Sequence, residues 1–467
     1  MKGLFSIGLL ALTVAFAGCE IIERLNDDDP RLPGTRVELF SDQDLGVPRS
    51  TNPVSIPQAQ NLTSWTQPGA TATHAVYHLS LAERPKRIWS RSIGRGNGKA
   101  YRITSTPIVV DGVIYVMDSQ LQVTAMRLSD GAVGWRKNLM PASESDGVFG
   151  GGLSYANGIL LAGTGAGRLY GLSSRTGNVI WQQRLNAPIH GGPTVDGNTV
   201  FATTIDNHAA AFELTSGRKQ WEHEGREGVT TILGSTAPAS AAGVTYIAYA
   251  SGEAFALASD TGRVLWSDTV AGMTATARTG MFIDDVGGPP LIDRDRLIVV
   301  GGSDRTVSFD IDRGIQAWEL PFGGTQMAWP SAQHYFIATD NGRLVAVDRD
   351  TGGIAWARSL PKYADASRLD RVEWFGPVLA ANRLILASST CLIRLNLSRP
   401  VAAPPGCRAL ARPRFEGAHG FPGIVQKGAR STAHAEPRGA RRPPSGGRDL
   451  PRSPAISRDL PPRPAAA

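Results

Sequence analysis

The sequence predicts an all-β protein, an eight-bladed β-propeller whose blades are four-stranded antiparallel sheets. A Gly-x-x-x-Trp phrase recurs six times, short β-rich runs fill the intervals, and no long helical pattern follows the first 20 residues. The repeated tryptophans are Trp135, Trp181, Trp221, Trp266, Trp318 and Trp356. Their spacings of 46, 40, 45, 52 and 38 residues are close to the period of a propeller blade.

Each repeat also contains the turn residues of an antiparallel meander. Asp111–Gly112, Asn157–Gly158 and Asp196–Gly197 lie between runs rich in Val, Ile and Thr, which predicts two-residue hairpins. The glycine of the repeated phrase is expected to supply the positive φ of a bulged hairpin. The tryptophan should then begin the fourth strand and pack its large apolar face against the next blade.

The ring is predicted to close with residues from both ends of the repeat region. Trp89 lacks the upstream glycine and is interpreted as the outer strand of a blade whose inner strands come from the other end of the chain. A seventh repeat begins at residue 377 and follows the pattern to Ser398, where Asp-Gly-x-x-x-Trp should come next. Six full repeats, this truncated seventh and one shared blade make eight. An open ring would leave strand edges uncovered.

The character of the sequence changes at residue 399. Residues 399–467 are rich in Pro, Ala and Arg and contain no Trp or Tyr, a composition that predicts disorder. The segment could be a genuine basic extension that binds anionic lipid or cell-wall polymer, a linker to a further domain, or the product of a frameshift near codon 398. The frameshift is favoured because the break falls within a motif.

This tail carries all the excess positive charge of the chain. Of 48 Lys and Arg residues, 13 lie in residues 399–467, which leaves 35 for the rest. Of 41 Asp and Glu residues, 4 lie there, which leaves 37. The propeller is therefore close to neutral, and the basic isoelectric point does not indicate a nucleic-acid-binding surface.

Residues 1–18 have the pattern of a lipoprotein signal peptide. An apolar run from Leu4 to Ala17 follows Lys2 and is too short to span a bilayer comfortably. It ends in Phe-Ala-Gly-Cys, which resembles a bacterial lipobox with Phe16 in place of the usual Leu. Cys19 is therefore predicted to carry acyl chains such as palmitate; a plain signal peptide is the alternative. Glu20, in place of the Asp that marks inner-membrane retention, favours the outer membrane. Residues 19–61 are predicted to be a flexible tether and residues 62–398 the propeller.

No catalytic, cofactor-binding or metal-binding residue is predicted. His74 and His78 are four apart, but neither a helix nor a third ligand is evident, so packing is the favoured interpretation. The acidic pairs Asp284–Asp285 and Asp348/Asp350 are interpreted as turn residues. Quinoprotein dehydrogenases, which use pyrroloquinoline quinone and calcium, share the repeated phrase but have adjacent cysteines over the cofactor. Here the cysteines are separate, and Cys391 either pairs with Cys407 or is a lone thiol.

The lipobox, the tether, the run "WTQPGATATHA" (65–75) and the repeated blades together resemble the BamB family. The resemblance implies an eight-bladed, non-catalytic scaffold lipoprotein on the periplasmic side of the outer membrane. It would bind the POTRA domains of a BamA-like assembly protein, alongside other lipoproteins of that complex, and assist the insertion of β-barrel proteins. A periplasmic quinoprotein-like dehydrogenase is the alternative.

The resemblance also implies a partner surface on two loops that join central blades. In the first, "GVTTILGSTAP" (228–238), Ile232 matches an apolar contact position, and Leu233 stands where an Arg often occurs. In the second, "DDVGGPP" (284–290), Asp285 keeps the acid of the family, and Gly287 stands where a second acid can occur. Ordinary loop residues are the alternative interpretation of these positions.

Overall fold

Each predicted repeat folds into one antiparallel sheet. The structure is a computed structural model, and it describes residues 47–82, 85–96, 102–142, 150–226, 236–270, 286–302, 305–363, 372–388 and 392–396. These residues contain 27 strands in seven sheets, and the described parts of the chain include no helix. Accordingly, nothing in these ranges could cross a membrane as an apolar helix.

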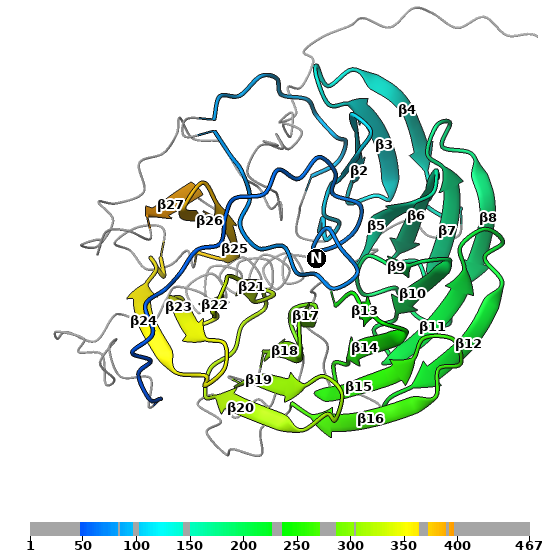
Figure 1. The fold of residues 1–467 in the computed structure, drawn as a ribbon. Helices are drawn as coiled ribbons and strands as arrows, with labels where there is room; N and C mark the ends of the chain where they lie inside the picture. The colour runs from blue at the N-terminus through cyan, green and yellow to red at the C-terminus, as the bar shows by residue number, and fades with distance from the viewer. Residues whose placement is uncertain are drawn as a thin grey trace, which may run out of the picture. The chain divides into compact units, whose positions relative to one another are not determined.

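Six sheets have four strands and one has three, and in each the strands lie in chain order. We name them blades 1 to 7. Figure 1 shows them succeeding one another around a centre, with β4, β8, β12, β16, β20 and β24 on the outside. The strands of blades 1 to 4 are β1 (Ile108–Val110), β2 (Val113–Met117), β3 (Gln122–Arg127), β4 (Val133–Asn138), β5 (Gly151–Ala156), β6 (Ile159–Thr164), β7 (Arg168–Ser173), β8 (Val179–Arg184), β9 (Thr194–Asp196), β10 (Thr199–Thr203), β11 (His208–Glu213), β12 (Lys219–Glu224), β13 (Ala239–Ala241), β14 (Val244–Ala248), β15 (Glu253–Ala258) and β16 (Val264–Thr269). The strands of blades 5 to 7 are β17 (Leu291–Asp293), β18 (Arg296–Gly301), β19 (Arg305–Asp310), β20 (Gln316–Leu320), β21 (Trp329–Pro330), β22 (His334–Thr339), β23 (Arg343–Asp348), β24 (Ile354–Ser359), β25 (Trp374–Ala380), β26 (Arg383–Ser388) and β27 (Leu392–Asn396).

The predicted hairpins form, with one shift. Asp111–Gly112 and Asn157–Gly158 have positive φ at both residues, as a two-residue hairpin of the I′ type requires. In blade 3, Asp196 pairs with Thr199, so the central residues are Gly197 and Asn198, one residue later than predicted. The shift leaves the strands unchanged because Gly197, at φ 59°, still supplies the positive φ of the turn.

The repeated phrase forms the last hairpin of each complete blade, as predicted. Its six glycines have φ between 68° and 74°. The tryptophan is the third residue of the fourth strand rather than its first. It lies opposite a small residue on the third strand, and a β-bulge follows directly. The small partners, from blade 1 to blade 6, are Ala125, Gly171, Ala211, Ala256, Ser308 and Ala346.

The tryptophans connect each blade to the next, as predicted. The indole N–H donates a hydrogen bond to a main-chain carbonyl in the last hairpin of the following blade, at 2.9 to 3.0 Å. The indole ring also covers the glycine of that hairpin; a Cβ on Gly217 would lie 2.5 Å from the ring of Trp181. The donor–acceptor pairs are Trp135–Ser174, Trp181–Leu214, Trp221–Ser259, Trp266–Ile311 and Trp318–Arg349. We call this contact the Trp–Gly latch. Trp356 has the same place in β24, but the part of blade 7 that would face it lies outside the described residues.

Trp89 makes the same contact with blade 1. Its indole donates to the Leu128 carbonyl at 2.8 Å, and a Cβ on Gly131 would lie 2.7 Å from its ring. The prediction that Trp89 belongs to the outer edge of a closing blade therefore agrees with its packing, although residues 85–96 form no strand. The segment predicted to supply the rest of that blade lies outside the described residues.

The apolar core lies between the blades. One buried cluster joins blades 2 and 3 through Leu161, Leu169, Val200 and Phe212. Equivalent clusters join blades 4 and 5 and blades 5 and 6. Because each blade contributes both of its faces to such clusters, its three inner strands are almost wholly buried, and only the fourth strand is largely exposed.

Candidate interaction site

The meander topology gives the propeller two different faces. In a four-stranded meander, the start of the first strand, the turn between the second and third strands and the end of the fourth strand lie at one edge. The loops that join consecutive blades therefore emerge on this side, which we call the loop face. The turns between first and second strands and the Trp–Gly hairpins lie on the opposite side, which we call the turn face.

The described ends of both predicted partner loops lie on the loop face, on either side of blade 4. Residues 228–238 connect β12 to β13, and residues 284–290 belong to the connection from β16 to β17. Ile232, Leu233 and Asp285 themselves lie outside the described residues, as does Cys19. The topology thus brings the two loops to the same side of one blade, and their residue contacts remain a prediction.

Polar contacts fix the ends of the first loop. Asn207 donates from its amide to the Arg226 carbonyl at 2.6 Å, and the Arg226 guanidinium lies 2.8 Å from the Glu253 carboxylate. Burial alone would raise the pKa of Glu253, but hydrogen bonds from Arg226 and Ser251 bring it below the ordinary value. At the other end, Thr236 is hydrogen bonded to His190 at 2.7 Å. Both ends of this loop are therefore held by side chains of blades 2 to 4.

The end of the second loop shows why no second acid occurs there. A Cβ on Gly287 would lie 2.5 Å from the Cα of Thr325, and one on Gly288 would lie 2.7 Å from the Met327 nitrogen. The main chain thus passes so close to residues 325–327 that an acidic side chain at 287 would displace it. This backbone path therefore disfavours an acid at position 287.

The turn face carries a long N-terminal segment. Residues 65–79, which we call the strap, form hydrogen bonds with all seven blades in chain order, and Figure 1 shows this blue segment crossing the centre of the propeller. The bonded pairs are Trp65–Val109, Thr66–Tyr155, Gln67–Val195, Ala72–Ser240, Thr73–Ile292, Tyr77–Trp329 and Leu79–Leu379, at 2.6 to 3.0 Å. The protein's own main chain therefore occupies the axis on this face.

The two strap histidines have packing roles. The buried His74 is hydrogen bonded through Nδ1 to the Pro290 carbonyl at 2.8 Å, and burial lowers its pKa to about 4. His78 donates from Nδ1 to the Pro57 carbonyl and accepts at Nε2 from the Asn382 N–H. The described residues hold no cluster of His, Cys, Asp or Glu that could bind a metal ion.

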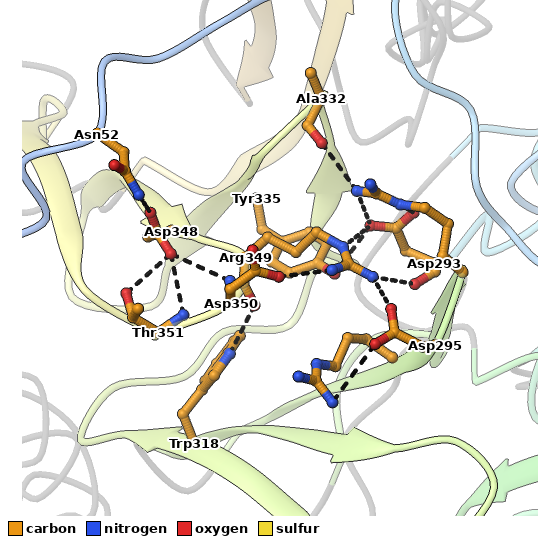
Figure 2. Close-up of polar contacts among 12 residues, drawn as sticks. Asn52, Asp293, Asp295, Trp318, Ala332, Tyr335, Asp348, Arg349, Asp350 and Thr351 are labelled. Carbon is orange, nitrogen blue, oxygen red and sulfur yellow. Dashed lines mark hydrogen bonds and ion pairs between the residues drawn. The ribbon is translucent and has the colours of Figure 1, made fainter.

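A buried polar network joins blades 5 and 6 around Asp293 and Arg349 (Figure 2), and Tyr77 connects it to the strap. The carboxylate of Asp293, which has no exposed surface, accepts hydrogen bonds from Tyr77 at 2.5 Å and Tyr335 at 3.0 Å. Arg349 and Arg294 also donate to this carboxylate, each from Nε to an Asp293 oxygen at 3.2 Å. Arg349 also binds Asp295 and Asp350. Burial and the bond to Asp293 raise the pKa of Tyr77 to about 12. Four donors surround one carboxylate, so the network has a structural role.

The predicted turn role of Asp348 is correct, and the residue has a second role. Its Oδ1 accepts from the main-chain N–H of Asp350 and of Thr351, at 3.1 and 3.0 Å. Its Oδ2 accepts from the Ser50 hydroxyl at 3.0 Å. It also accepts from the Asn52 amide at 2.6 Å (Figure 2). Although burial would raise the pKa of Asp348, these hydrogen bonds lower it to about 2. Residues 50–52, in the segment predicted as tether, are thus attached to blade 6.

The fold and the two faces define a propeller of the quinoprotein-like repeat class. The model of a family described as outer membrane protein assembly factor BamB matches residues 122–358, and the chain belongs to this family. It is 26% identical over 282 residues to the BamB of Shewanella oneidensis, covering 59% of this chain and 71% of the relative. It is 24% identical to that of Nitrosomonas eutropha over 335 residues, 71% of each chain.

Solved structures agree with the fold. BamB from Moraxella catarrhalis superposes with a TM-score of 0.54 at 20% identity, over 65% of this chain and 88% of that one. A europium-containing methanol dehydrogenase gives a TM-score of 0.56 at 15% identity, over 72% and 84%. At such identities these likenesses show the propeller fold alone, which both structures share.

Proposed function

We propose that this protein is a non-catalytic scaffold lipoprotein that takes part in the assembly of outer-membrane proteins. Membership of the BamB family is the observation that carries the proposal, because this family's description names that role. The protein would be anchored by acyl chains on Cys19 to the outer membrane and face the periplasm. Its partners would be a BamA-like protein with POTRA domains and other lipoproteins of the complex.

We propose the loop face of blade 4 as the surface that binds the assembly protein. The described ends of the two loops lie on the same side of the blade, and Arg226, Glu253 and Thr236 hold the ends of the first loop. The strap lies on the opposite face, so it does not cover this side in the part of the chain that the structure describes. An apolar side chain at Ile232 with an acid at Asp285 suits a contact with a partly basic partner surface.

Copurification with the assembly protein tests this surface. Ile232→Glu combined with Asp285→Arg should weaken the pull-down at least tenfold, because a loss of about 1–2 kcal/mol is usual for each removed hot spot. The matched control is Leu265→Glu, an exposed apolar residue on the rim of the same blade. Retention of the partner by the loop variant, with β-sheet circular dichroism unchanged, would place the interface elsewhere.

The anchor is tested separately from the interface. Cys19→Ala should release the protein from the membrane fraction, and mass spectrometry of the unaltered protein should find an acylated peptide beginning at Cys19. An unmodified N-terminus at another residue would contradict the lipoprotein assignment while leaving the loop-face proposal intact.

A periplasmic quinoprotein-like dehydrogenase is the second candidate. The methanol dehydrogenase shares the fold, and that likeness is the observation in its favour. Titration with pyrroloquinoline quinone and Ca²⁺ decides between the two candidates. Quinone absorbance that copurifies with the protein, together with dye reduction by alcohols, would support the enzyme and overturn the scaffold.

A further inference from the structure

The tether segment shows how the rim of a blade can bind an extended chain. Residues 48–50 pair in parallel with β24: the Ile354 N–H donates to the Pro48 carbonyl at 2.9 Å, and the Ser50 N–H donates to the Ile354 carbonyl at 3.0 Å. Val47 packs on the cluster that contains Trp318 and Ile354. Blade 6 thus gains a short fifth strand on its outer edge, and Ile354 is only 7% exposed.

The same edge recurs in the other complete blades. In blade 6, the Gly353 carbonyl accepts a hydrogen bond from the main-chain N–H of Asp348, the last residue of the third strand. The residue that precedes the Ile354 position makes the equivalent bond in every other complete blade. The N–H and C=O of the next residue must therefore point away from the sheet. The residues at this outward-facing position are Val133, Val179, Lys219, Val264 and Gln316. Among the described residues, none of these five pairs with a further segment.

Exposed apolar side chains gather at these unpaired edges. Val179 and Ile180 in β8 are 40% and 51% exposed, and Val264 and Leu265 in β16 are 41% and 42% exposed. Where the edge is occupied, in blade 6, the equivalent Ile354 is buried. Blade 3, which lies between blades 2 and 4, has Lys219 at this position. A charge on an edge strand opposes pairing with another chain. In blade 1, Val133 is also 40% exposed, but Gly134 follows it. Blades 2 and 4, where a second exposed apolar residue follows the valine, therefore combine the free backbone groups with the largest apolar surface at this position.

We propose that the outer edges of blades 2 and 4 bind extended segments of unfolded outer-membrane β-barrel proteins by parallel strand addition. This proposal rests on the proposed assembly function, because the strands of such clients alternate apolar and polar residues. Main-chain hydrogen bonds to Val179 or Val264 would supply affinity without a fixed sequence, and an apolar client residue would cover the valine.

The position before each valine sets a size limit on the client. In blade 6 it is Gly353, and a Cβ there would lie 3.1 Å from the Ser50 nitrogen. Blades 2 and 4 have Asn178 and Arg263 instead. A client strand must therefore lie a few tenths of an ångström further out than the tether and present a small residue at this point. Gly353 also explains why the tether itself selects blade 6.

Binding of a labelled peptide to the full chain tests the proposal. The probe is a fluorescein-labelled ten-residue peptide that alternates Val with Ser and Thr, and the readout is anisotropy. Val179→Lys combined with Val264→Lys copies the lysine that blade 3 already tolerates, and it should weaken binding at least tenfold. Lys219→Val should add a site. Ile315→Lys is the matched control, because Ile315 is 60% exposed on blade 5 but does not occupy the valine position; it should leave binding unchanged.

A second probe separates strand addition from simple apolar adhesion. The same peptide with N-methyl groups on alternate amides keeps its side chains and loses the donors along one edge, so it should not bind. Equal binding of the methylated peptide, or of the double lysine variant, would overturn the proposal. The lysine variants should still copurify with the assembly protein through the loop face. If the lysine variants lose peptide binding but still copurify with the assembly protein, the result supports the client edge and leaves the proposed function untouched. If copurification through the loop face fails, that result counts against the proposed function instead.

Discussion

Two glycines of blade 3 allow the Trp–Gly latch to be measured separately from backbone strain. Gly217 and Gly197 have similar φ values, 70° and 59°. A Cβ on Gly217 would lie 2.5 Å from the Trp181 ring, whereas a Cβ on Gly197 would meet nothing within 4 Å. Alanine at either position should cost roughly 1–2 kcal/mol because it is held in the left-handed region. Only Gly217→Ala should also disturb the contact between blades 2 and 3.

The additional cost follows from the distances at the latch. The indole must move about 1 Å to reach an ordinary contact of about 3.5 Å with the new methyl group. That movement strains the hydrogen bond from Trp181 to the Leu214 carbonyl, now 2.9 Å long. Overpacking costs about 1–3 kcal/mol and the strained hydrogen bond about 1 kcal/mol. Gly217→Ala should therefore lose about 2–4 kcal/mol more unfolding free energy than Gly197→Ala.

Urea unfolding followed by circular dichroism measures the difference, and a double variant checks its origin. In a Trp181→Leu background the ring is absent, so Gly217→Ala should cost no more than Gly197→Ala. Equal losses for the two glycine variants in the unaltered background would refute the latch as a source of stability.

The remaining predictions concern the strap and its buried polar groups. Asp293→Ala should lower the unfolding free energy by about 3–5 kcal/mol, because it removes the buried carboxylate that accepts from Tyr77, Tyr335 and Arg349; Tyr77→Phe, which removes one hydrogen bond, should cost about 1 kcal/mol, and thermal unfolding compares the two. The folded-state pKa of His74, about 4, lies below the ordinary value of 6.5, so the unfolded chain binds the proton first as the pH falls. Stability from this group is thus complete above pH 6.5 and is lost progressively down to about pH 4, by about 3 kcal/mol. His74→Phe should flatten that part of the stability–pH curve in urea titrations, and an unchanged slope would show that His74 is not the group responsible.

The blades could be predicted from the sequence because each depends on local signals that repeat. The glycine of the phrase, the tryptophan four residues later and the Asp-Gly or Asn-Gly turns act within one hairpin, so their spacing alone indicates the fold. The one-residue shift at Gly197 arose because Asp196 continues the strand, and propensity cannot distinguish an Asp that ends a strand from one that opens a turn. The packing of the repeated tryptophans against the next blade followed from the same pattern, whereas their contact with its glycine did not.

The strap and its network could not be predicted, because they depend on contacts between residues far apart in the chain. Tyr77 and Asp293 are 216 positions apart, and nothing near either one indicates the other. The run at residues 65–75 was noticed only through its resemblance to a family. An available signal was Asp293 itself, an acid at the end of an apolar first strand, where most other blades have a smaller or neutral residue. The partner loops were located by resemblance, and the topology adds that both flank blade 4 on one face.

The strap gives the N-terminal part of the chain a role in holding the ring together. A Trp–Gly latch links only consecutive blades, so its loss at one boundary weakens one boundary. The strap links all seven blades, and its seven contacts with them end on first strands, at the narrowest part of the propeller. Because it also contacts blade 7, the last sheet in the described chain, it can reach its final place only after that blade has folded. The strap should therefore form late in folding and make the blades unfold together rather than one after another.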